Sequence, residues 1–302
     1  TPVSAYLHSA TMVKAGIYLI ARMNPTLGGT DIWNITLTVV GGITMLYAAF
    51  QSVFKTDLKG ILAYSTIASL GIMVFLLGLN NEYSIQAVAT FIVVHALYKA
   101  ALFMTTGAID HSLHSRDITK LYGLQKMLPF VGIAGFLAAL SNAGIPLTFG
   151  FIGKDLIYES TLQSYGKYAI LLTGIAVITN ILLMYSGFLA GIKPFTGTYQ
   201  NQFKKFHAPD FWLYAPAIIL GLLGLIFGLF PKLAEALLLQ PMVNAIAGST
   251  IEMHLKIWHG WNLVLGLSGI TIFTGLILYF LVKPSHQKEN FLQKFEQLSP
   301  QS

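Results

Sequence analysis

The chain has no cysteine and very little charge. Charged residues occupy 10% of its 302 positions, whereas about 25% is usual for a soluble domain. Without cysteine the protein has no disulfide, no thiolate metal site and no cysteine nucleophile. The scarcity of charge, together with 55% hydrophobic residues, excludes an ordinary soluble domain. It predicts an all-α membrane protein, because backbone groups in lipid must be satisfied within helices.

Other familiar features are also missing. The chain opens Thr1-Pro2-Val3, without an initiator methionine or a signal peptide. Because its other end is equally abrupt, we interpret it as a fragment of a longer protein. No nucleophile elbow or phosphate-binding glycine loop occurs, so we expect no cofactor. The net charge of +6 indicates membrane orientation and not nucleic-acid binding, because no soluble domain carries a basic stripe.

What is present is a series of long apolar runs. About 20 helical residues cross a hydrocarbon core, and eight runs approach or exceed that length. They predict spans at 4–22, 34–54, 60–79, 84–109, 127–146, 167–192, 211–231 and 261–282. Lysine and arginine collect in the loops on one side of these spans, which predicts that this side, with the tail from residue 283, is cytoplasmic. The apolar segment 233–247 is short and contains Pro241, so we expect it to lie at the interface.

One predicted span is interrupted. Within 142–150, Pro146 removes a helical N–H donor, and Gly144 and Gly150 loosen the backbone on either side. Lys154 and Asp155 follow directly. This pattern predicts a discontinuous membrane helix of the kind that exposes backbone groups to ions. A loop leading to a surface helix, with an ordinary salt bridge at its start, is the alternative.

Lysines within apolar runs are the main candidates for function. A charge at the bilayer centre costs about 2.5 to 17 kcal/mol, so such residues usually face a protein interior or a water path. Lys14 lies near the middle of the first span, about 12–15 Å from either helix end. His8 precedes it by six residues and therefore lies on another face of the helix. A proton path and a structural hydrogen bond to a neighbouring carbonyl both fit Lys14.

His95 and Lys99 form the strongest local pattern. They stand at i and i+4, so they share one helix face inside an apolar run. Both side chains can change protonation when their environment shifts. The pair predicts consecutive stops for a proton.

Lys59 is a weaker candidate from its sequence context alone. It lies at the entrance of the third span, where it could extend to the interface or pair with Asp57. Tyr64 and Ser65 continue that segment as a polar stripe that could hold water. We assign Asp110, with the two histidines that follow it, to a solvated loop and not to a metal site.

Four segments resemble a known family. They are 1–16 (TPVSAYLHSATMVKAG), 57–66 (DLKGILAYST), 95–103 (HALYKAALF) and 144–155 (GIPLTFGFIGKD). In this order they resemble the proton-conducting antiporter-like proteins, which include the L subunit of respiratory complex I and the A subunit of Mrp-type sodium/proton antiporters. Lys14 within Met-Val-Lys-Ala-Gly resembles the Mrp branch. So does the later stretch 257–263.

The resemblance implies a chain of protonatable residues and water across the membrane centre. Its members would be His8, Lys59, His95, Lys99 and Lys154. Residues 1–210 would form the second half of the conducting domain and 211–302 further helices and a tail, with the first half-channel preceding Thr1.

The implied function is that of one component of a multisubunit monovalent cation/proton antiporter, which moves protons and Na⁺ or another monovalent cation and works with other subunits. A redox-driven pump of the complex I or membrane-bound hydrogenase type is the first alternative. A non-conducting scaffold is the second.

Overall fold

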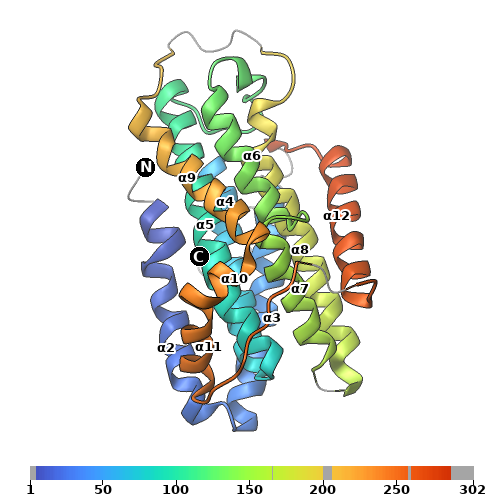
Figure 1. Cartoon of the computed structure of the whole chain (residues 1–302). Helices are drawn as coiled ribbons and strands as arrows, with labels where there is room; N and C mark the ends of the chain where they lie inside the picture. Colours follow the sequence, from blue (N-terminus) through green and yellow to red (C-terminus); the bar gives the residue numbers. More distant parts are fainter. Residues whose placement is uncertain (1–4, 165, 200–205, 258–259, 287–302) are drawn as a thin grey trace, which may run out of the picture.

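A computed structural model describes the chain except for residues 1–4, 165, 200–205, 258–259 and 287–302. The described residues form a helical bundle (Figure 1), with one isolated two-residue bridge between Asp57 and Asp117. The elements, in chain order, are η1 (Tyr6–Ala10), α2 (Met12–Leu27), α3 (Asp31–Phe54), α4 (Leu58–Leu79), α5 (Glu82–Leu113), η2 (Leu124–Lys126), α6 (Pro129–Ala143), α7 (Phe149–Leu162), η3 (Gly166–Tyr168), α8 (Ala169–Gly191), η4 (Lys193–Phe195), α9 (Phe211–Leu229), α10 (Pro231–Ala234), η5 (Glu235–Leu239), α11 (Gln240–Ala247) and α12 (Leu263–Leu281).

The predicted all-α membrane fold is confirmed. Within the described ranges, six helical stretches are long and apolar enough to cross a membrane singly: α3, α4, α5, the stretch containing α8, α9 and α12. The predicted first span is divided into a short π-helix, η1, and α2. The fifth span is the interrupted one, formed by α6 and α7 in succession.

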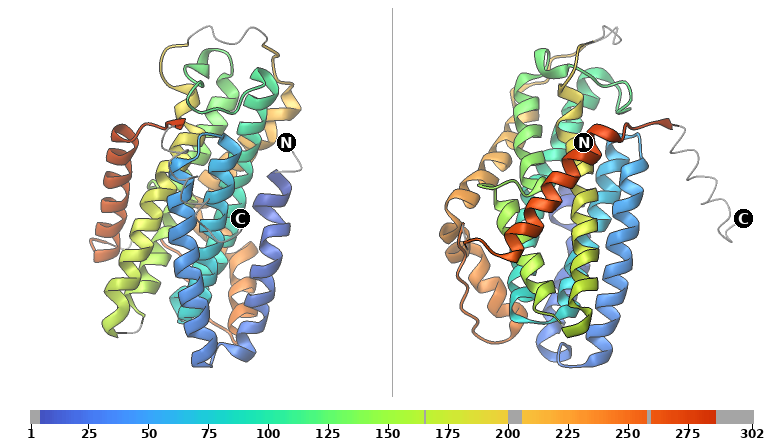
Figure 2. Two further views of the ribbon diagram at one scale, coloured as in Figure 1. Left: turned by 180° about the vertical axis from the view of Figure 1, so that it is seen from behind. Right: turned by 90° about the vertical axis from the view of Figure 1, so that its right-hand side faces the viewer.

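Helix α5 is the centre of the bundle. It packs against α4, α6, α7 and α9, and its buried residues point in all directions around its axis, as expected of a helix enclosed by others. A reciprocal capping box between Asn81 and Ser84 fixes its start. Figures 1 and 2 show α2 and α12 at opposite edges of the bundle, and α12 runs obliquely across α7 and α8.

The predicted helix break is confirmed and lies between Ala143 and Phe149. Gly144 ends α6 in the left-handed conformation, with φ of 72°, and Leu147 also has φ of 72°. Pro146 cannot donate the hydrogen bond that would continue the helix. At Gly150 a β-carbon would lie 1.7 Å from the main-chain oxygen of Ser141. Only glycine therefore permits α7 to start this close to the end of α6.

The segment that we expected at the interface is helical. After α9 the chain forms α10, η5 and α11, and α11 packs against α2 and α5. Leu239 and Val243 are fully buried there. The depth of this segment in a membrane stays a prediction. The predicted cytoplasmic tail lies outside the described residues from position 287 onward.

Candidate functional site

A row of polar groups runs along one face of α5. The row consists of the main-chain carbonyl of Ile92 and the side chains of His95 and Lys99. These residues are spaced three and four positions apart, so they lie on the same side of the helix. His95 is completely buried and Lys99 is 1% exposed. The bundle thus holds two protonatable side chains one turn apart in its interior.

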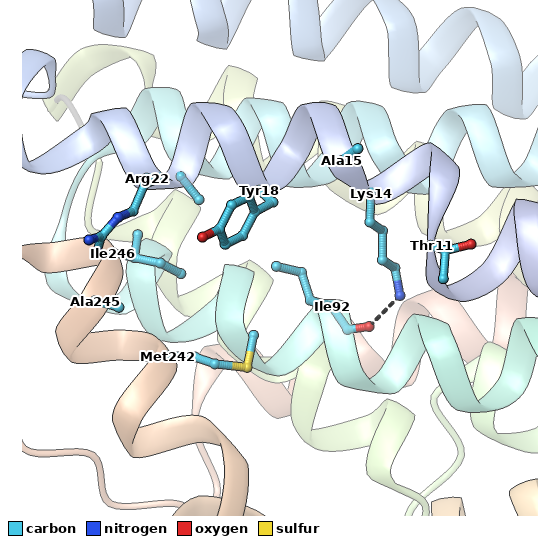
Figure 3. Close-up of a pocket in the computed structure, with 10 residues that line it drawn as sticks. Thr11, Lys14, Ala15, Tyr18, Arg22, Ile92, Met242, Ala245 and Ile246 are labelled. Atoms are coloured by element: carbon cyan, nitrogen blue, oxygen red, sulfur yellow. Dashed lines mark hydrogen bonds between the residues drawn. The ribbon is translucent and has the colours of Figure 1, made fainter.

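Lys14 joins this row from α2. Its ammonium Nζ donates a 2.7 Å hydrogen bond to the carbonyl oxygen of Ile92, and only 8% of the residue is exposed. Figure 3 shows its side chain reaching from α2 toward α5 across a pocket of about 360 Å³. Tyr18, Arg22 and Met242 also line this largely apolar pocket. Lys14 therefore lies where the polar row meets a cavity.

Lys99 connects the row to α4. Its Nζ donates a 2.8 Å hydrogen bond to Ser65 Oγ, and Ser65 in turn donates to the carbonyl of Leu62 in its own helix. The next polar residue along this face of α4, Ser69, lies 3.4 Å from the hydroxyl of Tyr98. Ser65, from the predicted polar stripe, and Ser69, one turn further along, thus both face α5.

His95 has unused hydrogen-bonding capacity. Among the described residues no hydrogen bond of normal geometry reaches either ring nitrogen, although the backbone of Ser9 lies close enough to interact with the ring. Lys14 and Lys99 both lie close enough to act on it electrostatically. Buried polar atoms without a protein partner are usually satisfied by water. The surroundings of His95 therefore suit a short water chain between two lysines.

Lys154 bonds across the helix break. Its Nζ donates a 2.9 Å hydrogen bond to the carbonyl oxygen of Ala143, the last residue of α6. The final carbonyls of a helix have no partner in their own ladder, and the helix dipole makes that end negative. Gly153 packs beside Val94, which places this part of α7 against α5 next to His95. The interruption thus supplies the acceptor for a buried cation.

Asp155 points to a different neighbour. It accepts a 2.6 Å hydrogen bond from Ser268 on α12 and lines a second pocket with Glu159. One turn further along α7, the hydroxyl of Tyr158 lies 2.7 Å from Thr271 Oγ1. Lys154 and Asp155 are therefore not an ion pair with each other. The alternative interpretation, an ordinary salt bridge at the start of this helix, is therefore wrong.

Lys59 lies apart from the buried row. It forms a 2.9 Å salt bridge with Asp110 at the end of α5, with both side chains about one-quarter exposed. Its suggested pairing with Asp57 is wrong, because Asp57 caps α4 and pairs with Arg116 at 2.9 Å. Asp110 lies in the last turn of α5 and not in a loop.

Tyr64 also lies outside the row. The ammonium of Lys55 lies 4.9 Å from the centre of its ring. Tyr64 therefore contacts a loop lysine and not the buried lysines.

Polar residues from three separate parts of the chain meet beside the loop after α5. Lys193 donates to the carbonyl of Ile118 at 2.5 Å, and His286 lies 3.0 Å from Asp117. Burial alone would raise the pKa of Asp117, but hydrogen bonds from Thr119 and His286 outweigh it and hold the pKa below its ordinary value. The Lys193 contact joins η4, directly after α8, to the loop after α5, and the His286 contact joins the segment after α12 to the same loop.

Two further polar residues were not singled out from the sequence. The side-chain amide of Asn142 donates a 2.7 Å hydrogen bond to the carbonyl of Leu183, which joins α6 to α8 just before the break. Tyr158, which contacts Thr271 on α12, is uncharged, so nothing in the sequence distinguished it from other apolar-segment tyrosines.

The side chain of His8 lies outside the described part, although its backbone belongs to η1. Within the described residues no group of three or more His, Asp or Glu is arranged to hold a metal ion.

Comparison with known proteins identifies the family. Residues 1–182 match the family model of proton antiporter membrane domains, described as NADH:quinone oxidoreductase/Mrp antiporter. The chain is 33% identical, over 94% of its length, to a protein of Alkalihalophilus pseudofirmus named as the A subunit of a Na(+)/H(+) antiporter. It is 36% identical, again over 94% of its length, to a protein of Rhizobium meliloti named as the probable A/B subunit of a K(+)/H(+) antiporter.

A solved structure agrees with these sequence relatives. A chain in the Mrp complex from Dietzia sp. DQ12-45-1b is 32% identical and superposes with a TM-score of 0.85 over 99% of this chain. The chain spans 39%, 29% and 32% of these three proteins respectively. The predicted resemblance to the antiporter-like proteins is confirmed, and the chain belongs to the NADH:quinone oxidoreductase/Mrp antiporter family of membrane proteins.

Proposed function

We propose that this chain is part of the proton-translocating subunit of a multisubunit monovalent cation/proton antiporter. It would work as a secondary transporter in the cell membrane, together with other subunits and with Na⁺ or K⁺ as the exchanged cation. The names of its relatives support this interpretation. Residues 1–210 would carry the second half of the conducting path, and 211–302 would supply supporting helices.

The observation that carries the proposal is the buried row on α5. The row places three protonatable groups within two turns of α5: His95 and Lys99 on the helix itself, and Lys14, which reaches it from α2. Lys14 bonds to the carbonyl of Ile92, and Lys99 bonds to Ser65. An ammonium group has three N–H donors, and each of these lysines makes one hydrogen bond to a described residue. The remaining capacity is available to water, which passes protons between neighbouring groups.

Repulsion between neighbouring charges would give the transfer its direction. A proton arriving at Lys99 disfavours a second positive charge on His95, and the same holds between His95 and Lys14. Lys154 on α7 extends the row toward the helix break. Lys59 and Asp110 would serve as the entrance on the lysine-rich side, since they are the part of the proposed path that is accessible to water.

The hydrogen bonds of these lysines also suit a non-conducting scaffold. Lys14 and Lys154 both donate to main-chain carbonyls, as purely structural lysines do.

We expect Lys99→Ala and Lys154→Ala, made in the complete complex, to lower antiport in membrane vesicles by about two orders of magnitude, which is the scale of losing a positioned proton-transfer group. Lys126→Ala, which removes an exposed lysine of η2, is the control.

Wild-type antiport with normal assembly in both variants would contradict the relay and favour the scaffold.

The family description also covers NADH:quinone oxidoreductase, so a redox-driven pump is the second candidate. The operon distinguishes the two candidates. Neighbouring genes for small antiporter subunits support antiport, and genes for iron–sulfur and quinone-site subunits support the redox pump.

A further inference from the structure

We infer that the pocket beside Asp155 is a binding site for the exchanged monovalent cation. This inference rests on the proposed antiport function and gives that function a place for its second ion. The pocket has a volume of about 220 Å³ and lies between α5, α7 and the segment that leads into α12. Its polar lining residues are Tyr83, Gln86, Asp155, Glu159, His254 and Asn262.

Two acidic residues give the pocket its charge. Asp155 and Glu159 are four residues apart on α7, so they stand one above the other, and they interact electrostatically. Within the described part of the chain neither forms a salt bridge with a basic residue. Ser268 and Gln163 donate neutral hydrogen bonds to them, both at 2.6 Å. The negative charge therefore has no counter-ion among the described residues, although the whole chain carries +6.

Gln86 is an independent sign of a ligand. It lines the same pocket from α5 and is only 7% exposed. Its side-chain amide makes no hydrogen bond to any residue that the structure describes. The residue lines the pocket, so a ligand bound there can supply the partner that the protein does not. A cation bound between the carboxylates would accept the amide oxygen of Gln86 as a third oxygen ligand.

The other polar residues explain why a weakly held ion fits better than a structural metal. The Asn262 side chain is already used, since its oxygen accepts from the Leu265 N–H at the start of α12. The side chain of His254 interacts with exposed Glu252 at 3.7 Å. Two carboxylates, the Gln86 amide and the Tyr83 hydroxyl remain. These are hard oxygen ligands, and within the described residues they include no group of three or more His, Asp or Glu of the kind that holds a structural metal.

The adjacent lysine gives the site a reason to exchange ions. Lys154 precedes Asp155 but turns toward Ala143, so its charge lies on the other side of α7. A protonated Lys154 repels a cation in the pocket, and a bound cation disfavours the proton on Lys154. By linkage each ion weakens the other by the same factor. That mutual exclusion is what an antiporter requires.

Carbodiimide labelling of the purified complete complex tests this site without relying on transport. Carbodiimides modify accessible carboxyl groups, and mass spectrometry reports the extent at Asp155 and Glu159. We expect NaCl or KCl to slow labelling of both by about tenfold relative to choline chloride of equal ionic strength, as mass action requires for an occupied site. Labelling of Glu82, an exposed acid in the first turn of α5, should not change.

Variants locate the ligands. Gln86→Leu should raise the cation concentration for half-maximal protection by about fivefold, and Glu159→Gln should abolish protection at Asp155. Equal carbodiimide labelling of Asp155 and Glu159 in sodium, potassium and choline salts would overturn the proposed cation site. So would a complete lack of labelling of both carboxylates in choline chloride. Protection that persists while Lys99→Ala transports normally would instead overturn the relay and leave the cation site intact.

Discussion

At the scale of single residues, each buried lysine is explained by one acceptor from another part of the chain. Lys14 uses a carbonyl of α5, Lys99 a hydroxyl of α4, and Lys154 the carbonyl that the helix break exposes. A buried charge is tolerated when it faces the interior of the bundle and is hydrogen-bonded. The positions of these lysines in apolar runs were evident from the sequence. Their acceptors were not, because the partners of Lys14 and Lys99 lie 78 and 34 residues away.

Ser65 offers a direct test of this arrangement. Ser65→Ala leaves Lys99 without its hydrogen-bond partner on α4, so we expect the complex to lose about 1–3 kcal/mol of stability and to transport more slowly. Thermal unfolding of the detergent-solubilised complex and antiport in vesicles measure the two effects. Thr66→Val is the matched control, because Thr66 bonds to Leu62 in its own helix. Equal behaviour of the two variants would show that Ser65 does not support Lys99.

At the scale of elements, the helix break is the feature that was predicted best from the sequence. Gly144 and Gly150 permit backbone positions that a side chain would block, and Pro146 removes a helical N–H donor. Each effect is local and can be predicted from the sequence. The contacts of Lys59 were predicted worst. Its true partner, Asp110, is 51 residues away, and Asp57 two residues earlier was misleading because it is used as a helix cap. Local spacing predicts a helix face, whereas ion pairing depends on which helices meet.

Gly150 tests whether the break positions Lys154. Gly150→Ala would force a β-carbon against Ser141 at the junction of α6 and α7. We expect a stability loss of about 1–3 kcal/mol, the usual cost of overpacking, with reduced antiport. Gly174→Ala on α8 has open space around it and should behave as wild type. A Gly150→Ala complex with normal stability and activity would mean that the close approach of α7 to α6 is not required.

At the scale of the whole molecule, two proposed ion sites lie on opposite faces of α7. The buried row of lysines and His95 runs through the centre of the bundle, and the acidic pocket opens beside α12. Composition and hydropathy were enough to predict the helical membrane fold, because both reflect the solvent in which the chain folds. The pocket could not be predicted, since it brings together α5, α7 and a segment about 100 residues further along the chain.

The central claim is that Lys99 works by gaining and losing a proton. Proton flux through the complete complex in proteoliposomes, measured for Lys99→Arg, tests it most directly. Arginine keeps the positive charge but stays protonated at all accessible pH values, and Lys99→Met serves as the uncharged counterpart. We predict assembled complexes with proton flux at background in both variants, while Lys126→Arg conducts normally. Wild-type proton flux through an assembled Lys99→Arg complex would contradict the claim.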